Sequence, residues 1–149
     1  MRLTNFTDYA LRVLIYLGAH RDEVRLATIS DVATAYGISE NHLMKVVHQL
    51  AKLGYVKTVR GKGGGMQLAR APGEISLGEV VRSTEEDFAV VECFQEGPPK
   101  CSIAHACTLQ GILAQSLHAF LAVLDRHTLA DLLQPQIRII KIDRAPGTF

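Results

Sequence analysis

Apolar residues recur at three- and four-residue intervals along the first fifty positions of the chain and predict amphipathic helices there. The first predicted helix covers about residues 6–20, and its apolar face consists of Phe6, Ala10, Val13, Leu14 and Leu17. A second begins at Thr28, where Asp31 completes a variant of the capping box, and it ends at Gly37. Both helices are expected to bury their apolar faces in one core.

A third predicted helix has one apolar and one polar side. It is capped by Ser39 and reaches about Leu53, and Gly54 stops it. The inner stripe consists of Leu43, Val46, Val47 and Leu50, and the outer side carries Asn41, His42, Lys45, His48 and Lys52. Because only a tight turn at 37–38 precedes it, this helix and the one before it are expected to form a helix–turn–helix.

Two short strands follow and predict a β-hairpin. They cover residues 55–60 and 66–70, and the five residues GKGGG between them make a flexible, positively charged tip. Beyond the hairpin, Ser76 and Glu79 form a capping box that opens a short helix to about residue 83. This order of elements is typical of a winged helix–turn–helix domain.

The C-terminal half contains one long apolar helix. It is predicted over about residues 108–125, and its wide apolar face consists of Leu109, Ile112, Leu113, Leu117, Phe120, Leu121 and Leu124. Thr128 and Asp131 open a last short helix before Pro135. The predicted fold class is therefore mainly α with a small β-hairpin, a winged helix–turn–helix domain plus a long helix.

Composition and charge narrow the function. The 149 residues are 48% hydrophobic and 21% charged, which is enough for a folded core. No apolar run approaches a membrane span and the polar start MRLTNFTDY is no signal peptide, so the expected compartment is the cytoplasm. Residues 1–70 hold ten Lys/Arg against five Asp/Glu, whereas residues 71–149 hold six against ten. The basic half is therefore expected to bind a polyanion.

Double-stranded DNA is the polyanion that fits best. Amide, imidazole and ammonium groups on the third helix can donate to base edges in a major groove, and the hairpin carries the cations Lys57, Arg60, Lys62 and Arg70. The candidate DNA-binding residues are Thr28, Ser39, Asn41, His42, Lys45, Arg60 and Lys62. The alternative for the third helix is a polar face that is merely solvated. The tip GKGGG lacks the pattern of a nucleotide-binding loop.

The only three cysteines, Cys93, Cys101 and Cys107, lie within one segment. An odd number leaves a thiol over after disulfide pairing, and in the cytoplasm such clustering indicates metal binding or redox activity. The spacing C-x7-C-x5-C is wider than that of zinc sites, and it favours an iron–sulfur cluster with a fourth ligand from elsewhere. His105 is the nearest internal candidate, although a lone loop histidine more often has a surface role.

Three segments resemble the Rrf2 family of winged-helix transcription regulators: MRLTNFTDYALR, ISENHLMKVVHQLAKLGYVKTVRGKGGG and the three-cysteine segment. The resemblance runs from Met1 to about Leu133 and is strongest to the branch of nitric-oxide-sensing iron–sulfur repressors. It implies a homodimer in which residues 108–125 form the dimerisation helix and each protomer's cysteines hold one cluster.

The same resemblance implies a fourth ligand from the first helix of the partner subunit. In this branch the ligand is an aspartate, and the matching residue is Asp8. Taken alone, Asp8 is an acidic first-turn residue paired with Arg12 four positions later. A sister branch instead uses a histidine three residues after the last cysteine, where this chain has Gln110.

The predicted function is a repressor that releases a palindromic operator when nitric oxide destroys its cluster, with [4Fe–4S] favoured over [2Fe–2S] and no membrane partner. An enzyme is not expected, since no nucleophile–base–acid set occurs outside the cysteine segment. The alternatives are a regulator that senses iron–sulfur or redox status, and an adaptor whose winged helix binds protein. The expected units are a DNA-binding domain (1–84), a cluster-binding loop (85–107), the dimerisation helix with a short helix (108–134) and a tail (135–149).

Overall fold

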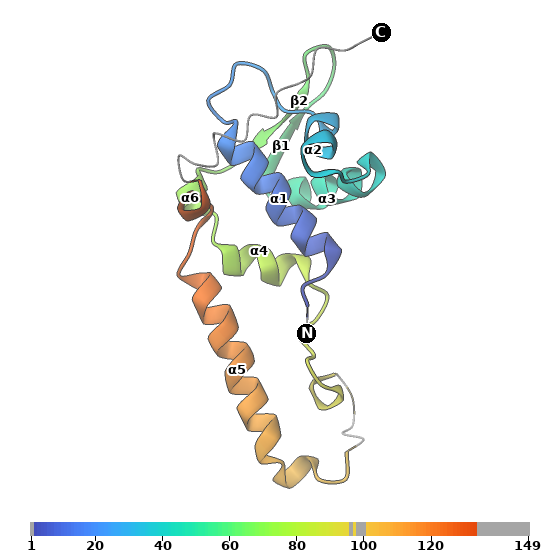
Figure 1. The fold of residues 1–149 in the computed structure, drawn as a ribbon, viewed down its shortest axis with the longest axis vertical. Coiled ribbons are helices and arrows are strands. Elements are labelled where there is room, and N and C mark those ends of the chain that lie inside the picture. The colour runs from blue at the N-terminus through green and yellow to red at the C-terminus, as the bar shows by residue number, and fades with distance from the viewer. Residues whose placement is uncertain (1, 96, 98–100, 134–149) are drawn as a thin grey trace.

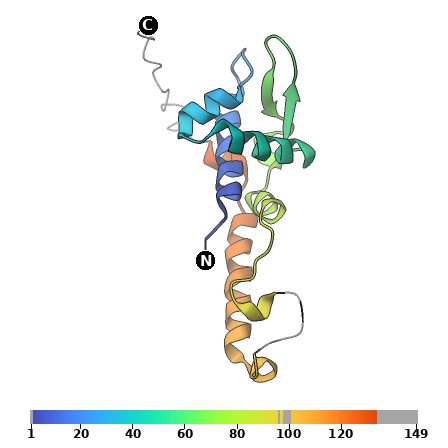
Figure 2. The ribbon, with the colours of Figure 1, turned by 90° about the vertical axis from the view of Figure 1, so that its right-hand side faces the viewer.

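The chain forms a small head from which one long helix projects (Figures 1 and 2). The structure is a computed structural model, and it describes residues 2–95, 97 and 101–133. The helices are α1 (Asn5–Ala19), α2 (Ile29–Tyr36), α3 (Glu40–Lys52), α4 (Leu77–Thr84), α5 (Thr108–Asp125) and α6 (Leu129–Leu132). The strands are β1 (Val56–Val59) and β2 (Gly65–Leu68), and single 3-10 turns cover Pro72–Glu74, Glu92–Phe94 and Ala104–Ala106. The predicted fold class is confirmed.

The caps of α2 and α3 follow from the residues that flank these helices. Thr28 and Asp31 form the reciprocal capping box that the sequence predicts at the start of α2. Gly37 ends α2 in the left-handed conformation, with φ of 65°, which a side chain would disfavour. The Ser39 side chain then accepts a hydrogen bond from the backbone N–H of His42 and opens α3.

The core lies where α1, α2 and α3 meet the hairpin and α4. All four residues of the predicted inner stripe of α3 are buried, as are Ala10, Val13, Leu14 and Leu17 of α1. The core also contains Tyr55, Ile75, Val80 and Leu129. Because Leu129 belongs to α6, the chain returns from the far end of α5 and packs α6 against the head.

The hairpin is antiparallel, with Val56 opposite Leu68 and Val59 opposite Gly65. The backbone N–H of Met66 also donates to the carbonyl oxygen of Ala27 at 2.7 Å, so the segment before α2 pairs with the edge of β2. A Cβ atom at Gly65 would collide with that segment. Both strands are shorter than predicted, because Arg60 and Arg70 lie outside the paired residues.

One expectation needs correction, and two others lie beyond the described residues. The capping box at Ser76 is only half formed, because Ser76 Oγ accepts from the N–H of Glu79 while the Glu79 carboxylate pairs with Arg70. The predicted tail and the side chain of His105 lie outside the described residues.

Helix α5 has the predicted bounds but leaves its apolar face uncovered. Within the described chain none of its 18 residues is buried, and Leu109 and Ile112 are 60% and 55% exposed. No described helix meets the length and hydropathy needed to cross a membrane.

Candidate DNA interface and cluster site

The outer face of α3 is a continuous polar surface. Its exposed side chains are Asn41, His42, Lys45, His48 and Lys52, all of which the sequence assigned to this side. Met44 is 49% exposed beside them and offers an apolar group on this face, which the apolar pattern of the helix did not predict. Hydrogen-bond donors and one apolar group at the N-terminal half of the helix are what base-edge recognition in a major groove requires.

The His42 ring connects this surface to α1. It lies 6.3 Å from the ring of Tyr9, measured between centroids, with the two planes tilted by 33°. Tyr9 directly follows Asp8, so a displacement at the start of α1 would be felt by a side chain on the outer face of α3.

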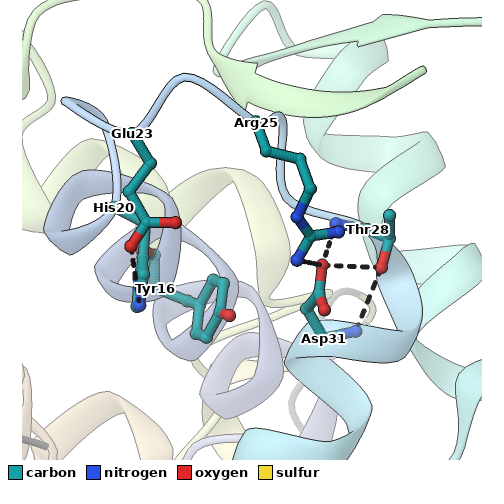
Figure 3. Close-up of polar contacts among 6 residues, drawn as sticks. All are labelled: Tyr16, His20, Glu23, Arg25, Thr28 and Asp31. Atoms are coloured by element: carbon teal, nitrogen blue, oxygen red, sulfur yellow. Dashed lines mark hydrogen bonds and ion pairs between the residues drawn. The ribbon is translucent and has the colours of Figure 1, made fainter. Parts of the chain in front are cut away.

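The start of α2 is held by a polar cluster around Asp31 (Figure 3). One oxygen, Asp31 Oδ2, accepts from the backbone N–H and the hydroxyl of Thr28, each at 2.8 Å, and from Arg25 Nη2 at 2.9 Å. Burial alone would raise the pKa of Asp31, but the hydrogen bonds from Arg25 and Thr28 outweigh it and lower the pKa to about 2. Because the Thr28 hydroxyl is engaged in this cluster, it fixes the position of the α2 N-terminus.

The tip of the hairpin presents cations on flexible backbone. Arg60 and Lys62 are both exposed, and Gly61 and Gly63 have φ values of 97° and 77°, which only glycine adopts readily. Lys57 is also exposed on β1.

Arg70 departs from the sequence-based expectation that it serves the wing. Its guanidinium donates to the carbonyl oxygens of Leu53 and Gly54 at 3.3 and 3.2 Å, and it lies 4.8 Å from the centroid of the Tyr55 ring. These contacts satisfy carbonyls at the C-terminal end of α3, so Arg70 stabilises the helix end. Its partners are distant in sequence from it, which is why local pattern did not reveal them.

The segment that carries the cysteines runs beside α5 and joins its far end, away from the head (Figures 1 and 2). Cys93 is in the turn Glu92–Phe94, Cys101 is exposed, and Cys107 directly precedes α5. All three are free thiols. In the part of the chain that the structure describes, no three His, Cys, Asp or Glu side chains converge closely enough to hold a metal ion.

The chemistry of the three cysteines fits a soft metal cluster. An open cavity of about 950 Å³ lies between residues 86–95 and α5, and Cys93 is the one described cysteine that lines it, with Gln110 and His118. Three thiols without disulfide partners are the donor set that iron–sulfur clusters use. The partial positive charge at the start of α5, next to Cys107, also favours an anionic group.

Asp8 is paired within its own helix. Its carboxylate accepts from Arg12, with Oδ2 2.9 Å from Nη2 and Oδ1 3.1 Å from Nε, and both side chains are partly exposed. Arg12 also lies 5.8 Å from the centroid of the Tyr36 ring in α2. Asp8 is on the head, whereas Cys107 is at the other end of α5, which is about 27 Å long for its 18 residues.

The start of α1 contacts the beginning of the cysteine-bearing segment. Glu85 Oε1 accepts from the backbone N–H and the hydroxyl of Thr4 at 2.8 and 3.1 Å. One residue earlier, Thr84 and Thr7 share a buried hydroxyl–hydroxyl hydrogen bond of 2.9 Å. These contacts join residues 77 and 81 positions apart, so spacing along the sequence could not reveal them.

Comparison with known proteins agrees with this geometry. Residues 3–135 match the Rrf2 family, described as iron-dependent transcriptional regulators. The HTH-type transcriptional regulator NsrR of Bacillus subtilis (strain 168) is 51% identical over 142 residues, which cover 95% of this chain and 97% of that protein. The regulator of the same name from Geobacillus kaustophilus (strain HTA426) is 52% identical over 134 residues, 90% of each chain.

Solved structures give the same architecture. CymR (YrzC), the global cysteine regulator of B. subtilis, has a TM-score of 0.71 at 26% identity and covers 89% of this chain and 96% of its own. T. potens IscR has a TM-score of 0.72 at 25% identity, with 99% and 94% covered. The similar proteins named here are regulators rather than enzymes.

Proposed function

The chain belongs to the Rrf2 family of iron-dependent transcriptional regulators, and we propose that it is a homodimeric DNA-binding repressor whose iron–sulfur cluster senses nitric oxide. One observation carries the proposal: the polar outer face of α3 (the reading surface) and three free thiols in the segment beside α5 occur in one chain. Such an arrangement separates the DNA-binding groups from the sensing groups, as a regulator requires.

On the DNA side, α3 enters a major groove and the hairpin follows the backbone. Asn41, His42 and Lys45 are exposed on α3 and donate to base edges or phosphates. Arg60 and Lys62 contact phosphates or enter the adjacent minor groove. Thr28 and Ser39 hold the starts of α2 and α3, where backbone N–H groups can meet phosphate oxygens.

The dimer is formed through α5. Its exposed apolar residues, which include Leu109, Ile112 and Val123, need a cover, and a second copy of the same helix supplies one of matching length. Two heads related by a two-fold axis would bind a palindromic operator with half-sites about 34–36 Å apart, or a multiple of this.

The cluster is held by Cys93, Cys101 and Cys107 of one protomer and by Asp8 of the partner subunit. The length of α5 supports a ligand from the partner, because α5 separates Cys107 at its start from the head, in which α1 carries Asp8. Four protein ligands can hold either a [4Fe–4S] cluster, with one ligand for each iron, or a [2Fe–2S] cluster, with two, and of these we favour [4Fe–4S]. When bound, this cluster supplies an iron that nitric oxide attacks, and an oxygen ligand beside three thiolates leaves that iron weakly held.

Ligation by Asp8 competes with its ion pair to Arg12. A bond from Asp8 to a cluster iron would require this ion pair to open. Since Tyr9, next to Asp8, packs near the His42 ring, such a change would reach the reading surface.

The functional units that follow are a DNA-binding domain over 1–84, a cluster-binding loop over 85–107 and a dimerisation unit over 108–134, with 135–149 as a tail. Because its ligand is the operator, the protein acts in the cytoplasm of a bacterial cell.

The test is anaerobic purification followed by absorption spectroscopy, intact mass measurement and operator binding, before and after a nitric oxide donor. We expect a cluster in the purified protein, salt-dependent operator binding, and loss of both after nitric oxide. A protein with an intact cluster and no salt-dependent DNA binding would support the adaptor instead. A cluster that ignores nitric oxide while iron depletion or oxidation controls DNA binding would support the iron–sulfur status sensor.

A further inference from the structure

The C-terminal end of α5 packs against α4 of the head, and we call this junction the joint. It contains an ion pair that no part of the proposed function uses. Arg82 of α4 donates through Nη1 and Nη2 to the two carboxylate oxygens of Asp125, the last residue of α5, with Nη2 2.7 Å from Oδ2. We propose that this pair, which packs against Gly78, fixes the angle between the head and α5. It thereby sets the half-site spacing that the dimer recognises. The inference rests on the proposed dimeric operator binding.

The geometry of the pair favours a role in orientation over one in stability. Two parallel hydrogen bonds between a guanidinium and a carboxylate fix direction as well as distance. Both side chains are 43% exposed, and pairs at such exposure add little to folding stability. The two hydrogen bonds between Arg82 and Asp125 nevertheless have to break before α5 can rotate against α4.

Gly78 leaves the space that the ion pair occupies, because it has no side chain. A Cβ atom at this position would collide with the Asp125 carboxylate and would lie 2.9 Å from Arg82 Nη1. Gly78 is buried on the face of α4 that α5 approaches, so a larger residue would displace the carboxylate from its partner. The absence of a side chain in mid-helix therefore has a geometric reason.

Backbone hydrogen bonds hold the other side of the joint. The N–H of Leu77 donates to the carbonyl oxygen of His127 at 2.9 Å, and the N–H of Leu129 donates to that of Ile75 at 2.8 Å. These bonds fix where α5 ends, and the Arg82–Asp125 pair then fixes the direction in which it leaves.

Helix α4 connects α5 to α3, the helix that carries the reading surface. Glu79 lies one turn before Arg82 and pairs at 3.5 Å with Arg70, whose guanidinium donates to carbonyls at the end of α3. The Tyr55 hydroxyl, just after α3, lies 3.5 Å from Ser83 Oγ. Helix α4 is thus tied to α3 through Glu79 and Ser83 and to α5 through Arg82.

The length of α5 makes the joint sensitive. A rotation of about 10° would move the far end of a helix about 27 Å long by about 5 Å, which exceeds the ~3.4 Å rise of one base pair. In a dimer joined through α5, the same rotation displaces each head relative to its partner and therefore changes the distance between the two α3 surfaces.

The experiment measures affinity of the cluster-loaded protein for three operators that share half-sites but differ in spacer: native, one base pair shorter and one longer. Arg82→Gln, Asp125→Asn and Gly78→Ala are each expected to lower the preference for the native spacer by about threefold or more. The charge-swapped double variant Arg82→Asp with Asp125→Arg should recover part of that preference. Affinity for a single half-site, the cluster spectrum and the thermal midpoint should stay close to wild type.

Arg126→Gln is the matched control, because it removes an exposed positive charge next to Asp125 without touching the pair. Unchanged spacer preference in both Arg82→Gln and Asp125→Asn would overturn the inference. An equal loss on all operators and on the half-site would also overturn it, since the pair would then support only the fold of the head. If the wild type binds no paired half-sites, the proposed function fails instead, so the two failures are distinguishable.

Discussion

Asp31 shows how a single carboxylate organises the start of α2. Three donors converge on one of its oxygens, and together they hold its pKa at about 2, below the value of about 3.9 for a free aspartate. The folded state therefore favours the charged form, and the resulting stability is present above about pH 4 and is lost as the pH falls toward 2.

Asp31→Asn is expected to lower the free energy of unfolding by about 1–2 kcal/mol at pH 7, as the loss of a helix cap does. The difference from wild type should shrink as the pH falls from 4 toward 2. Urea unfolding of the cluster-free protein at pH 7, 4 and 2.5 measures this. Ser30→Ala, an exposed change beside the cap, is the control. A penalty that stays constant across this pH range would show that the carboxylate charge is not what stabilises the cap.

Variants of Asp8 test the nitric oxide sensor hypothesis most directly. Asp8→Ala is expected to assemble a cluster that is more labile or altered in its spectrum, with weaker control of DNA binding. Asp8→Cys should hold iron more tightly through a fourth thiolate and slow the reaction with nitric oxide. Absorption spectra and cluster lifetimes under a nitric oxide donor measure both effects. If Asp8→Ala equals wild type in all of them, Asp8 serves only its ion pair with Arg12.

At the scale of elements, the proposed function gives α3 and the hairpin different roles in DNA binding. Arg60→Ala or Lys62→Ala should weaken binding to all sequences and reduce the salt slope by about one unit each. Asn41→Ala and His42→Ala should instead relax discrimination at individual base pairs, by about 1–3 kcal/mol where a contact is bidentate. Titrations against operators with single substitutions, at several salt concentrations, separate the two effects. Four variants with unchanged operator affinity would rule out this surface as the DNA reader.

The elements themselves could be predicted because each has a local signal. Helix α5 begins and ends where the apolar pattern places it, and Thr28 and Asp31 mark α2 by their spacing alone. The branch of the family was also accessible, since its motifs are contiguous in sequence. Local signals cannot show which side chains meet across the fold. Arg70 was therefore assigned to the wing, although it caps α3, and the brace from Arg25 to Asp31 was missed.

Contacts between distant segments escaped prediction for the same reason. The hydrogen bonds from Thr4 to Glu85 and the pairing of Arg82 with Asp125 join elements whose relative placement depends on the whole core. A capping motif gave the wrong partner at Glu79, because the fold places Arg70, nine residues away in sequence, 3.5 Å from its carboxylate. Tertiary placement, rather than local preference, decides such cases.

At the scale of the whole molecule, α5 and the segment that carries the cysteines extend away from the head, which carries α3 and the hairpin (Figure 1). The cysteine segment is nevertheless tied to the head, because Glu85 at its beginning holds the N–H of Thr4 at the start of α1. A cluster that orders the cysteine segment would thus also order the helix on which Tyr9 and Asp8 lie. Cluster loading and operator affinity should therefore change together.

Cys93→Ala, Cys101→Ala and Cys107→Ala test this coupling. Three thiolates are the smallest set that can hold the cluster beside one oxygen ligand, so each variant should lose its iron and sulfide and bind the operator more weakly. Affinity for unrelated DNA should change much less, since the cations of the hairpin are untouched. Ser102→Ala, an exposed neighbour of Cys101, is the control and should keep both cluster and affinity. Iron and sulfide analysis alongside operator titration gives the result, and a variant that retains its full iron would remove that cysteine from the ligand set. A variant that loses its iron but binds the operator as tightly as wild type would show that the head does not respond to the cluster.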